Sequence, residues 1–340
     1  MSYLSTLAQA KPGEHVFAKY VRILGKGKTG SRSLTEEEAY TAMTMILTGQ
    51  VESLQLGAFL MLLRVKEESQ QELTGFVRAV RDSLHAPTDI PVDLDWSSYA
   101  GKKKQLPWFL LSCFCMADQG IRLYMHGTLG HTEGRLYTQD VLQALNIPVA
   151  LNWGDVRTQI DDSHFCYMPL SRLCAPLQQI IDFRRLFGLR SPVHTLSRLI
   201  NPLAAPYSMQ SIFHPAYADS HQQAAQSLEQ QNAAVFKGEG GEIERRPEAI
   251  TTVKRVVNGV IEEEIWPKMT EGRQAPMDDL NIDQLKAVWR GEADNDYGYQ
   301  AIIGTTAIAL RLLGKANDQS EAFTLAEHYW QQRNRSRLAE

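Results

Sequence analysis

The sequence predicts an α/β protein in which a small all-helical N-terminal domain precedes a larger α/β domain with a mainly parallel central sheet. Apolar residues recur at helical spacing through the first 85 residues, which predicts a group of packed helices. After residue 86, short apolar runs alternate with amphipathic segments, a pattern typical of parallel strands covered by helices. With 340 residues, 44% of them hydrophobic, the chain is long enough to form two packed units.

Capping motifs mark the starts of the N-terminal helices. Thr35 with Glu38 and Ser69 with Glu72 form capping boxes ahead of periodic apolar runs. Ser53 is the expected cap of a helix between these two. Helical periodicity alone predicts one more helix before them. We therefore expect four helices in the first domain.

The second domain is expected to alternate strands with helices. The predicted strands are residues 121–125, 149–152, 209–214 and 233–236. The predicted helices are residues 138–145, 175–186 and 222–230. Glycine-rich segments at 127–134 and 238–241 follow two of the strands, and ligands of parallel sheets bind where strands end.

A segment containing proline and aspartate, residues 86–95, is typical of a linker between the two domains. We expect the helical domain at residues 1–85, joined by helices around 157–187. The α/β domain then comprises residues 86–156 and 188–340.

The charge distribution leaves two interpretations open. The net charge is −4, which argues against a generic nucleic-acid binder. Residues 96–200, however, contain 11 lysines and arginines against 7 acidic residues, whereas residues 201–340 contain 14 against 20. A clustered basic face binds polyanions even on an acidic protein, and the alternative is a solvated surface without a partner.

Composition and motifs also indicate where the protein is located and which kinds of chemistry it lacks residues for. No apolar run reaches the roughly 20 residues of a membrane helix, and the N-terminus lacks a signal-peptide pattern. The four cysteines have no zinc-site spacing, so we interpret them as reduced core residues. We expect a cytoplasmic protein that binds neither metal nor membrane. No nucleophile elbow or activated cysteine is present, so no catalytic residue is predicted.

Three basic segments contain residues suited to anion binding. The first, GKGKTGSR at residues 25–32, interleaves glycines with cations. The second, SSYAGKKKQ at residues 97–105, places three lysines beside an aromatic ring and suits a phosphate backbone with a stacked base. The third, residues 184–202, contains four arginines, whose planar forks suit phosphate oxygens. The structural alternatives are a helix connector, a solvated turn and ordinary surface arginines.

A fourth segment, HGTLGHTEGR at residues 126–135, runs into a predicted helix. Free backbone N–H groups at a helix start make such a loop a candidate anion site. His126, His131 and Glu133 have no spacing that matches a known metal site, so we predict none there.

The order of these segments resembles the anthranilate phosphoribosyltransferase superfamily over nearly the whole chain. The resemblance rests on LGAFL at residues 56–60, the His-Gly loop at 126–127 with DVLQAL at 140–145, the R-R-x-x-G-x-R pattern at 184–190, Asn201-Pro202 and His214-Pro215. It implies the fold of that class of phosphoribosyltransferases.

The resemblance also shows where the chain departs from the enzymes. Their G-T-G-G-D loop, which holds a diphosphate, corresponds to residues 97–105, which contain one glycine and three lysines. Their K-H-G-N-R segment corresponds to MHGTL at 125–129, and the asparagine on the anthranilate side corresponds to His194. Their magnesium-binding Asp-Glu pair corresponds to residues 238–242, which contain no adjacent Asp-Glu pair. The residual donor-site loop consists of Gly101, His126, Gly127, Thr128 and His194.

These departures resemble the YbiB-like branch of the superfamily. The shared features are the S-Y-x-G-x-K-K-Q segment that ends at Gln105, the His-Thr-Leu segment at 194–196 and the Gly-Lys-Gly-Lys loop. The resemblance implies a homodimer paired through the helical domains. It also implies a basic groove that binds nucleic acid, single strands included, without marked sequence preference.

Three hypotheses follow. The first is a nucleic-acid-binding protein that needs no cofactor, with Tyr99 or Trp108 stacking on bases. Its predicted contacts are Lys26, Lys28, Arg32, Tyr99, Lys102, Lys103, Lys104, Arg184, Arg185, Arg190 and Arg198. The second is a phosphoribosyltransferase with a changed acceptor, which would use magnesium and phosphoribosyl diphosphate at His126, Gly127, Arg185 and Glu242. The third is a protein-interaction scaffold without a ligand.

Overall fold

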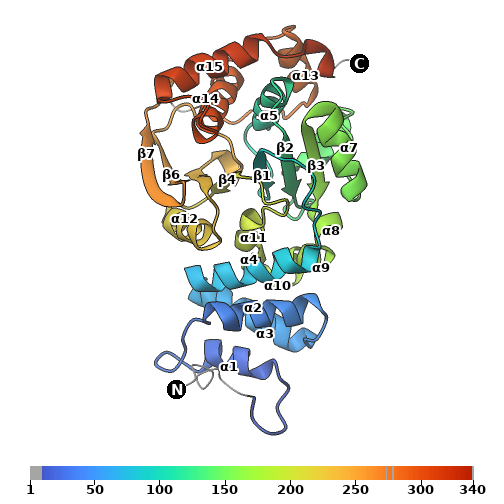
Figure 1. Ribbon diagram of the computed structural model, residues 1–340, viewed down its shortest axis with the longest axis vertical. Coiled ribbons are helices and arrows are strands. Elements are labelled where there is room, and N and C mark those ends of the chain that lie inside the picture. The colour runs from blue at the N-terminus through green and yellow to red at the C-terminus, as the bar shows by residue number, and fades with distance from the viewer. Residues whose placement is uncertain (1–9, 273, 278, 339–340) are drawn as a thin grey trace. The chain divides into compact units, whose positions relative to one another are not determined.

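The chain consists of two compact units, shown in Figure 1. The computed structural model describes residues 10–272, 274–277 and 279–338. The helical unit combines Met1–His85 with Cys174–Ile200, and the α/β unit combines Ala86–Leu173 with Asn201–Glu340.

The segment that returns to the helical unit differs from the sequence prediction. It comprises residues 174–200, whereas the sequence prediction places it around 157–187. The reason is that α7 (Trp153–Ser163) packs against β3 (Phe165–Pro169) and so belongs to the α/β unit.

The helical unit has the expected N-terminal helices. They are α1 (Ala18–Gly25), α2 (Glu36–Leu47), α3 (Ser53–Lys66) and α4 (Gln70–Leu84). The returning segment adds α9 (Ala175–Asp182), α10 (Arg184–Phe187), α11 (Val193–Leu196) and the short helix η2 (Ser197–Leu199). Both predicted capping boxes are confirmed, with Thr35 before α2 and Ser69 before α4. The cap of α3 is Glu52 rather than Ser53, because Glu52 and Gln55 form the capping box there.

The α/β unit is built on a seven-stranded sheet in the order β3-β2-β1-β4-β5-β6-β7. The other strands are β1 (Leu94–Ser98), β2 (Leu123–Gly127), β4 (Tyr207–Ile212), β5 (Asn232–Lys237), β6 (Thr251–Val257) and β7 (Val260–Trp266). The first five strands in this order are parallel, and β6 and β7 are antiparallel. The predicted fold class, a helical N-terminal domain with a mainly parallel α/β domain, is confirmed.

Three of the four predicted strands are confirmed as β2, β4 and β5, and one prediction is wrong. Residues 149–152 form no strand, because Asn152 caps α7 by accepting a hydrogen bond from the N–H of Asp155 at 3.0 Å. The predicted helix at 175–186 is divided at Phe183 into α9 and α10.

Helices cover both faces of the sheet. They are α5 (Phe109–Asp118), α6 (Thr138–Ala144), α7, α8 (Leu170–Leu173), α12 (Ala218–Ser227), α13 (Asp283–Arg290), α14 (Asp296–Leu312) and α15 (Gln319–Gln331), with short helices η3 (Pro215–Tyr217), η4 (Glu239–Gly241) and η5 (Arg335–Leu338). Figure 1 shows α5 and α13 to α15 gathered on one side of the sheet, and α12 packs against β5 and β6. The main core lies where α5 and α14 meet the sheet.

Two sequence expectations about the interior and the membrane can be compared with this fold. The four cysteines are free and buried, in agreement with their interpretation as core residues. Within the described ranges, no helix combines the length and the apolar character that crossing a bilayer requires.

The strand order reverses next to β1. The chain passes from β1 outward to β2 and β3, then returns to β4 on the other side of β1 and continues to β5. In open α/β sheets, ligands bind outside the carboxyl ends of the strands at such a reversal. The loops after β1, β4 and β5 are therefore the expected place for a site.

Candidate anion-binding site

A pocket of about 400 Å³ opens at this place in the α/β unit. It is lined by Lys103, Lys104, Gln105, Arg135, Phe213, Lys237, Gly238, Glu239, Gly240, Arg246, Glu248, Gln274, Ala275, Pro276 and Tyr297. We call this the basic pocket, because five lysines and arginines line it against two carboxylates.

Three lysines of the basic pocket are exposed and uncompensated. Lys103 and Lys104 lie in the loop after β1, and Lys237 is the last residue of β5. None of the three forms an ion pair with any residue in the described part of the chain. Their ammonium groups are therefore available to an anionic ligand.

The two arginines of the basic pocket are held by protein groups. One guanidinium nitrogen of Arg135 (Nη1) donates to the carbonyl oxygens of Ala100 at 3.0 Å and Gly101 at 2.9 Å. Arg246 forms an ion pair with Glu248 at 2.8 Å. Arg135 makes these bonds to neutral carbonyl groups, so they leave its positive charge uncompensated.

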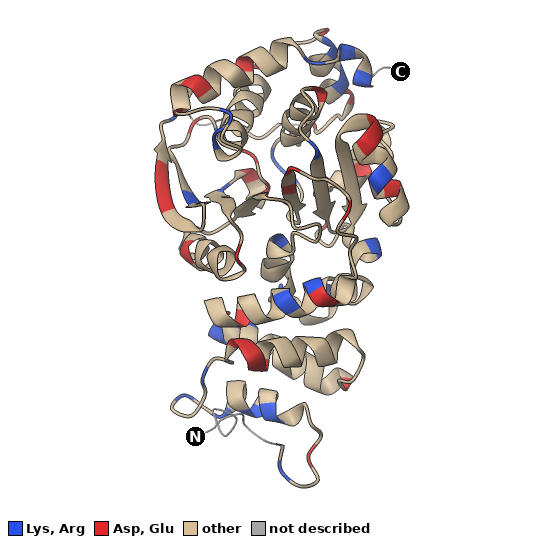
Figure 2. Ribbon diagram, in the orientation of Figure 1, with Lys and Arg blue, Asp and Glu red and all other residues tan. Residues whose placement is uncertain are grey.

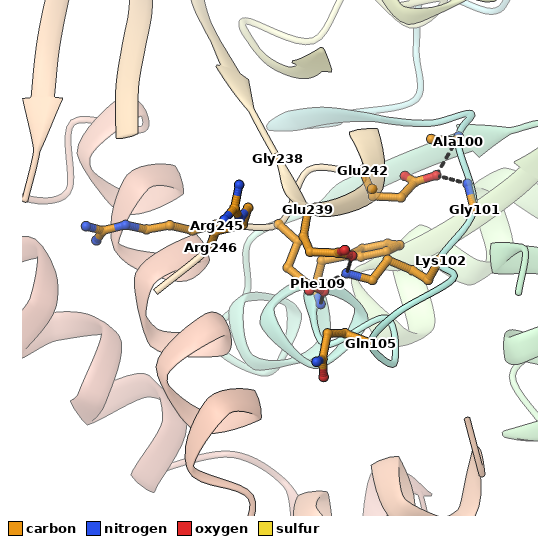
Figure 3. Close-up of polar contacts among 12 residues, drawn as sticks. Ala100, Gly101, Lys102, Gln105, Phe109, Gly238, Glu239, Glu242, Arg245 and Arg246 are labelled. Carbon is orange, nitrogen blue, oxygen red and sulfur yellow. Dashed lines mark hydrogen bonds and ion pairs between the residues drawn. The ribbon is translucent and has the colours of Figure 1, made fainter. Parts of the chain in front are cut away.

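The loop after β1 encloses a carboxylate of the same chain. The backbone N–H groups of Ala100 and Gly101 both donate to Oε1 of Glu242, each at 2.6 Å (Figure 3). Glu242 is 1% exposed, and Gly101 has a φ of +69°, which glycine adopts without strain. Two adjacent amides directed at one oxygen form a backbone anion site. A side chain of the protein itself therefore occupies this site.

Lys102 is buried, so the prediction that it contacts phosphates is wrong. Its Nζ forms ion pairs with Glu239 and with Oε1 of Glu244, the latter at 2.5 Å. Its backbone pairs with Leu136 through two hydrogen bonds of 2.8 Å, which hold the residue inside the loop. The ammonium group therefore neutralises buried carboxylates instead of facing solvent.

A second anion-binding position, the start of α5, is also occupied by a side chain of the protein. Oε2 of Glu244 accepts a hydrogen bond from the N–H of Phe109, the first residue of α5, at 2.9 Å. A carboxylate is stabilised there by the partial positive charge of the helix start. Burial nevertheless raises the pKa of Glu244 to about 7, although the charge of Lys102 opposes the rise.

This raised pKa predicts a specific pH dependence of stability. Because the folded-state pKa of Glu244 exceeds its usual 4.5, the folded protein binds this proton more tightly than the unfolded chain. The contribution of Glu244 to the free energy of unfolding is complete below pH 4.5 and is lost as the pH rises to about 7. We expect E244Q to remove on the order of 2 kcal/mol of this pH dependence. Urea unfolding of both proteins at about pH 5 and about pH 7.5 measures it, and equal pH dependence would show that Glu244 does not titrate in this range.

The turn that carries these carboxylates requires a glycine. A Cβ on Gly238 would lie 1.7 Å from the carbonyl oxygen of Glu242 and 2.6 Å from Oγ of Ser211. The N–H of Gly238 donates to that same hydroxyl at 3.1 Å. Close packing at Gly238 thus fixes where η4 begins and directs Glu239 toward Lys102, as Figure 3 shows.

The predicted base-stacking residues are not available to a ligand. Tyr99 is 1% exposed, and its hydroxyl lies 2.6 Å from Nδ1 of His126, whose Nε2 is 3.4 Å from Asp95. Trp108 is fully buried, and a Cβ on Gly298 of α14 would lie 2.8 Å from its ring. Both stacking predictions are wrong because these rings fill the core beneath the loop after β1.

The residual donor-site loop consists of packing residues. A Cβ on Gly127 would lie 2.2 Å from the carbonyl oxygen of Ser98, and Thr128 is 1% exposed. His126 is fully buried in the chain of contacts with Tyr99. His194 belongs to the helical unit, where its Nδ1 lies 3.1 Å from the carbonyl oxygen of Ser191. Gly101 donates to an anion, and that anion is Glu242.

The remaining predicted cations belong to the helical unit and differ in exposure. Lys26, Lys28 and Arg185 are exposed. Arg184 and Arg190 are half-buried, and Arg198 is buried at 8% exposure. Arg32 forms two hydrogen bonds of 2.6 and 2.7 Å with Glu38, which compensates its charge. The prediction that Arg198 contacts phosphates is therefore wrong, whereas the contact of exposed Arg32 stays a prediction.

Three cations and the most exposed aromatic residue of the basic pocket are absent from the predicted contacts. Lys237 and Arg135 adjoin glycine-rich segments that follow predicted strands. Because ligands of parallel sheets bind where strands end, this position was the signal for both residues. Phe213, which is 48% exposed, follows β4 and carries the same signal. Arg246 has no comparable sequence signal, because only the folded turn after η4 brings it to the pocket.

Comparison with known proteins identifies the family. Models of the glycosyl transferase family match residues 19–84 with its helical bundle domain and residues 109–332 with its a/b domain. The chain therefore belongs to this glycosyl transferase family, and the resemblance inferred from the sequence is confirmed.

Individual relatives agree with this assignment. The uncharacterized protein YbiB of Escherichia coli is 28% identical over 59% of this chain, which spans 64% of YbiB, somewhat less than two thirds. The anthranilate phosphoribosyltransferase of Sulfolobus acidocaldarius is 25% identical over 87% of this chain and 88% of its own length. The enzyme of that name from Saccharomyces cerevisiae, solved in complex with PRPP and Mg, has the same fold, with a TM-score of 0.79 at 16% identity over 96% of both chains.

The carboxylates beside the basic pocket do not fit a magnesium ion. Glu242 is held by two amides, whereas Glu239 and Glu244 share the ammonium group of Lys102. Magnesium requires several oxygen ligands whose charge is free to face it. Among the residues with a described position, no group of three or more histidines, cysteines or acidic residues could hold a metal.

Proposed function

We propose that the chain binds nucleic acid without marked sequence preference, through phosphate contacts at the basic pocket. The observation that carries this proposal is the set of three exposed, uncompensated lysines around one pocket. Exposed lysines without an ion-pair partner attract any polyanion, and their binding to its phosphates releases the counterions of those phosphates. We further propose single-stranded DNA or RNA as the ligand and the cytoplasm as the place of action.

The arrangement of the lysines supports contacts with several phosphates. Lys103 and Lys104 come from the loop after β1, whereas Lys237 ends β5, and β4 lies between these two strands in the sheet. Cations on separate elements around an open pocket suit an extended strand better than one compact phosphate group.

An exposed ring supports single strands as the ligand. Phe213 lines the basic pocket and is the aromatic side chain there that faces solvent most. Stacking of a base on such a ring tolerates every base, which agrees with weak sequence preference.

The surface charge of the α/β unit supports the same location. Edge strand β7 carries Glu262, Glu263 and Glu264, which appear as a red patch in Figure 2. Ion pairs compensate Glu263 and Glu264 in part, so this edge offers phosphates no attraction, whereas the lysines at the carboxyl ends of the parallel strands attract them. In the helical unit, Lys26, Lys28 and Arg185 are exposed and are proposed as additional contacts.

Fluorescence anisotropy of labelled single-stranded DNA and RNA against the purified protein tests the proposal. We expect binding that weakens steeply between about 50 and 200 mM salt, with a logarithmic slope of roughly −2 to −4 for three to five phosphates. Scrambling the sequence should change the affinity little. Absence of binding to either strand at low salt would refute the proposed function.

We also propose a homodimer paired through α3. This helix buries Phe59, Leu60 and Leu63 inside its unit, yet Leu54 and Val65 are 89% and 84% exposed on its other side. A helix that is apolar on both sides is normally covered on both. Because residues 54 and 65 are eleven positions apart, they lie on one face. A second copy of the chain covers such a face by self-complementary pairing.

We expect L54E/V65E to convert the dimer into a folded monomer, because two buried carboxylates would face each other across the two-fold axis. Analytical ultracentrifugation measures the mass. The control T41E/Q71E adds the same charge to exposed positions on α2 and α4 and should leave the dimer intact. A wild-type protein that sediments as a monomer would contradict the proposed pairing.

A further inference from the structure

The structure assigns Glu242 as a specificity-determining residue: its carboxylate occupies a backbone anion site and so excludes small phosphate and diphosphate ligands. This inference is independent of nucleic-acid binding, since it concerns a buried site behind the basic pocket and not the exposed lysines.

The geometry of the site is that of an anion-binding site. The N–H groups of Ala100 and Gly101 converge on one carboxylate oxygen at 2.6 Å each, as short as the shortest charge-assisted hydrogen bonds. The other oxygen of Glu242, Oε2, is buried and has no hydrogen-bond partner among the described residues. A buried charged oxygen without a partner is costly, so the two amides must provide most of the stabilisation. A phosphate group makes the same bonds to such amides.

The anion site adjoins the solvent-filled basic pocket. Glu239 and Gly240, close before Glu242 in the chain, line the basic pocket, and so does Arg135. Arg135 donates to the carbonyl oxygens of Ala100, Gly101 and Gly240, so it joins the anion site to the wall of the pocket. Removing the Glu242 side chain therefore leaves a space next to an open, positively charged pocket.

The positive groups next to the anion site are already neutralised by carboxylates of the protein. Lys102 is engaged by Glu239 and Glu244, and the start of α5 is engaged by Glu244 (Figure 3). Neither of these positive groups is left to attract a small anion past Glu242. The carboxylate thus closes the buried site, and anionic ligands are confined to the exposed lysines.

The test compares E242A with E242Q, E262A and wild type by calorimetric titration of inorganic pyrophosphate. Alanine leaves both amides free, so we expect E242A to bind pyrophosphate about tenfold or more tightly than wild type. In E242Q the side-chain carbonyl oxygen still accepts from both amides and keeps the site closed, so this variant should resemble wild type. E262A also removes one carboxylate, from exposed β7 outside the basic pocket, but frees no amide, and it should resemble wild type.

A stability measurement keeps the inference falsifiable if E242A folds poorly. Pyrophosphate or formate should raise the melting temperature of E242A, or restore its folding, and should do much less for E242Q. Equal pyrophosphate binding by E242A and wild type would overturn the inference. An unfolded E242A that neither anion restores would overturn it as well.

Discussion

Reversing the charge of three lysines, K103E/K104E/K237E, is expected to weaken single-stranded nucleic-acid binding by about 100-fold or more at low salt. All three side chains line the basic pocket, are exposed and form no ion pair with a residue of described position. Each lysine that neutralises a phosphate releases counterions, so the salt slope should also become shallower by roughly two. Anisotropy at several salt concentrations measures both quantities.

The matched control is a lysine at the other end of the strands. Lys315 is exposed, and its charge lowers the pKa of Asp93, so the two side chains are near each other. Asp93 directly precedes β1, whereas the basic pocket lies at the carboxyl end of β1. K104E and K315E change the net charge equally, and we expect only K104E to reduce affinity strongly. Similar losses in both variants would show that net charge governs binding rather than the basic pocket.

Replacement of the neighbouring lysine is expected to affect folding. K102M should destabilise the protein by about 3–5 kcal/mol, because it leaves Glu239 and Glu244 buried without their shared cation. Urea unfolding near neutral pH measures the loss. Acidic pH should reduce this loss, since protonation neutralises Glu244.

A compensated variant separates charge from packing. K102M/E239Q/E244Q removes the buried charges together, so it should recover much of the stability lost in K102M. If K102M alone were as stable as wild type, the ion-pair cluster would not be important for the fold. The consecutive lysines 102, 103 and 104 thus have opposite expected roles, one in folding and two in binding.

The fold was largely predictable because periodicity and capping report local structure. The helices of the N-terminal domain and the strands β2, β4 and β5 follow from such patterns. β1 was missed because Asp95, Ser97 and Ser98 make it appear polar, although the whole strand is buried and His126 faces Asp95. The hairpin of β6 and β7 was missed because three consecutive glutamates in β7 resemble an exposed loop.

The candidate site was only partly predictable because its defining contacts join distant residues. The sequence indicates a basic loop at residues 102–104, and Lys103 and Lys104 do line the basic pocket. It cannot show that Lys102 turns inward, because its partner Glu244 lies 142 residues further along the chain. The sequence names Glu242 only as a donor-site residue of a transferase, since a glutamate after a glycine pair gives no sign that it occupies backbone amides.

Crosslinking of a single strand that carries photoreactive thymine analogues, followed by peptide mass spectrometry, tests most directly that nucleic acid binds at the basic pocket. We predict crosslinks in the peptides that contain Lys103, Phe213 and Lys237, and their loss at high salt. Crosslinks confined to the helical unit, or to acidic β7, would contradict the account.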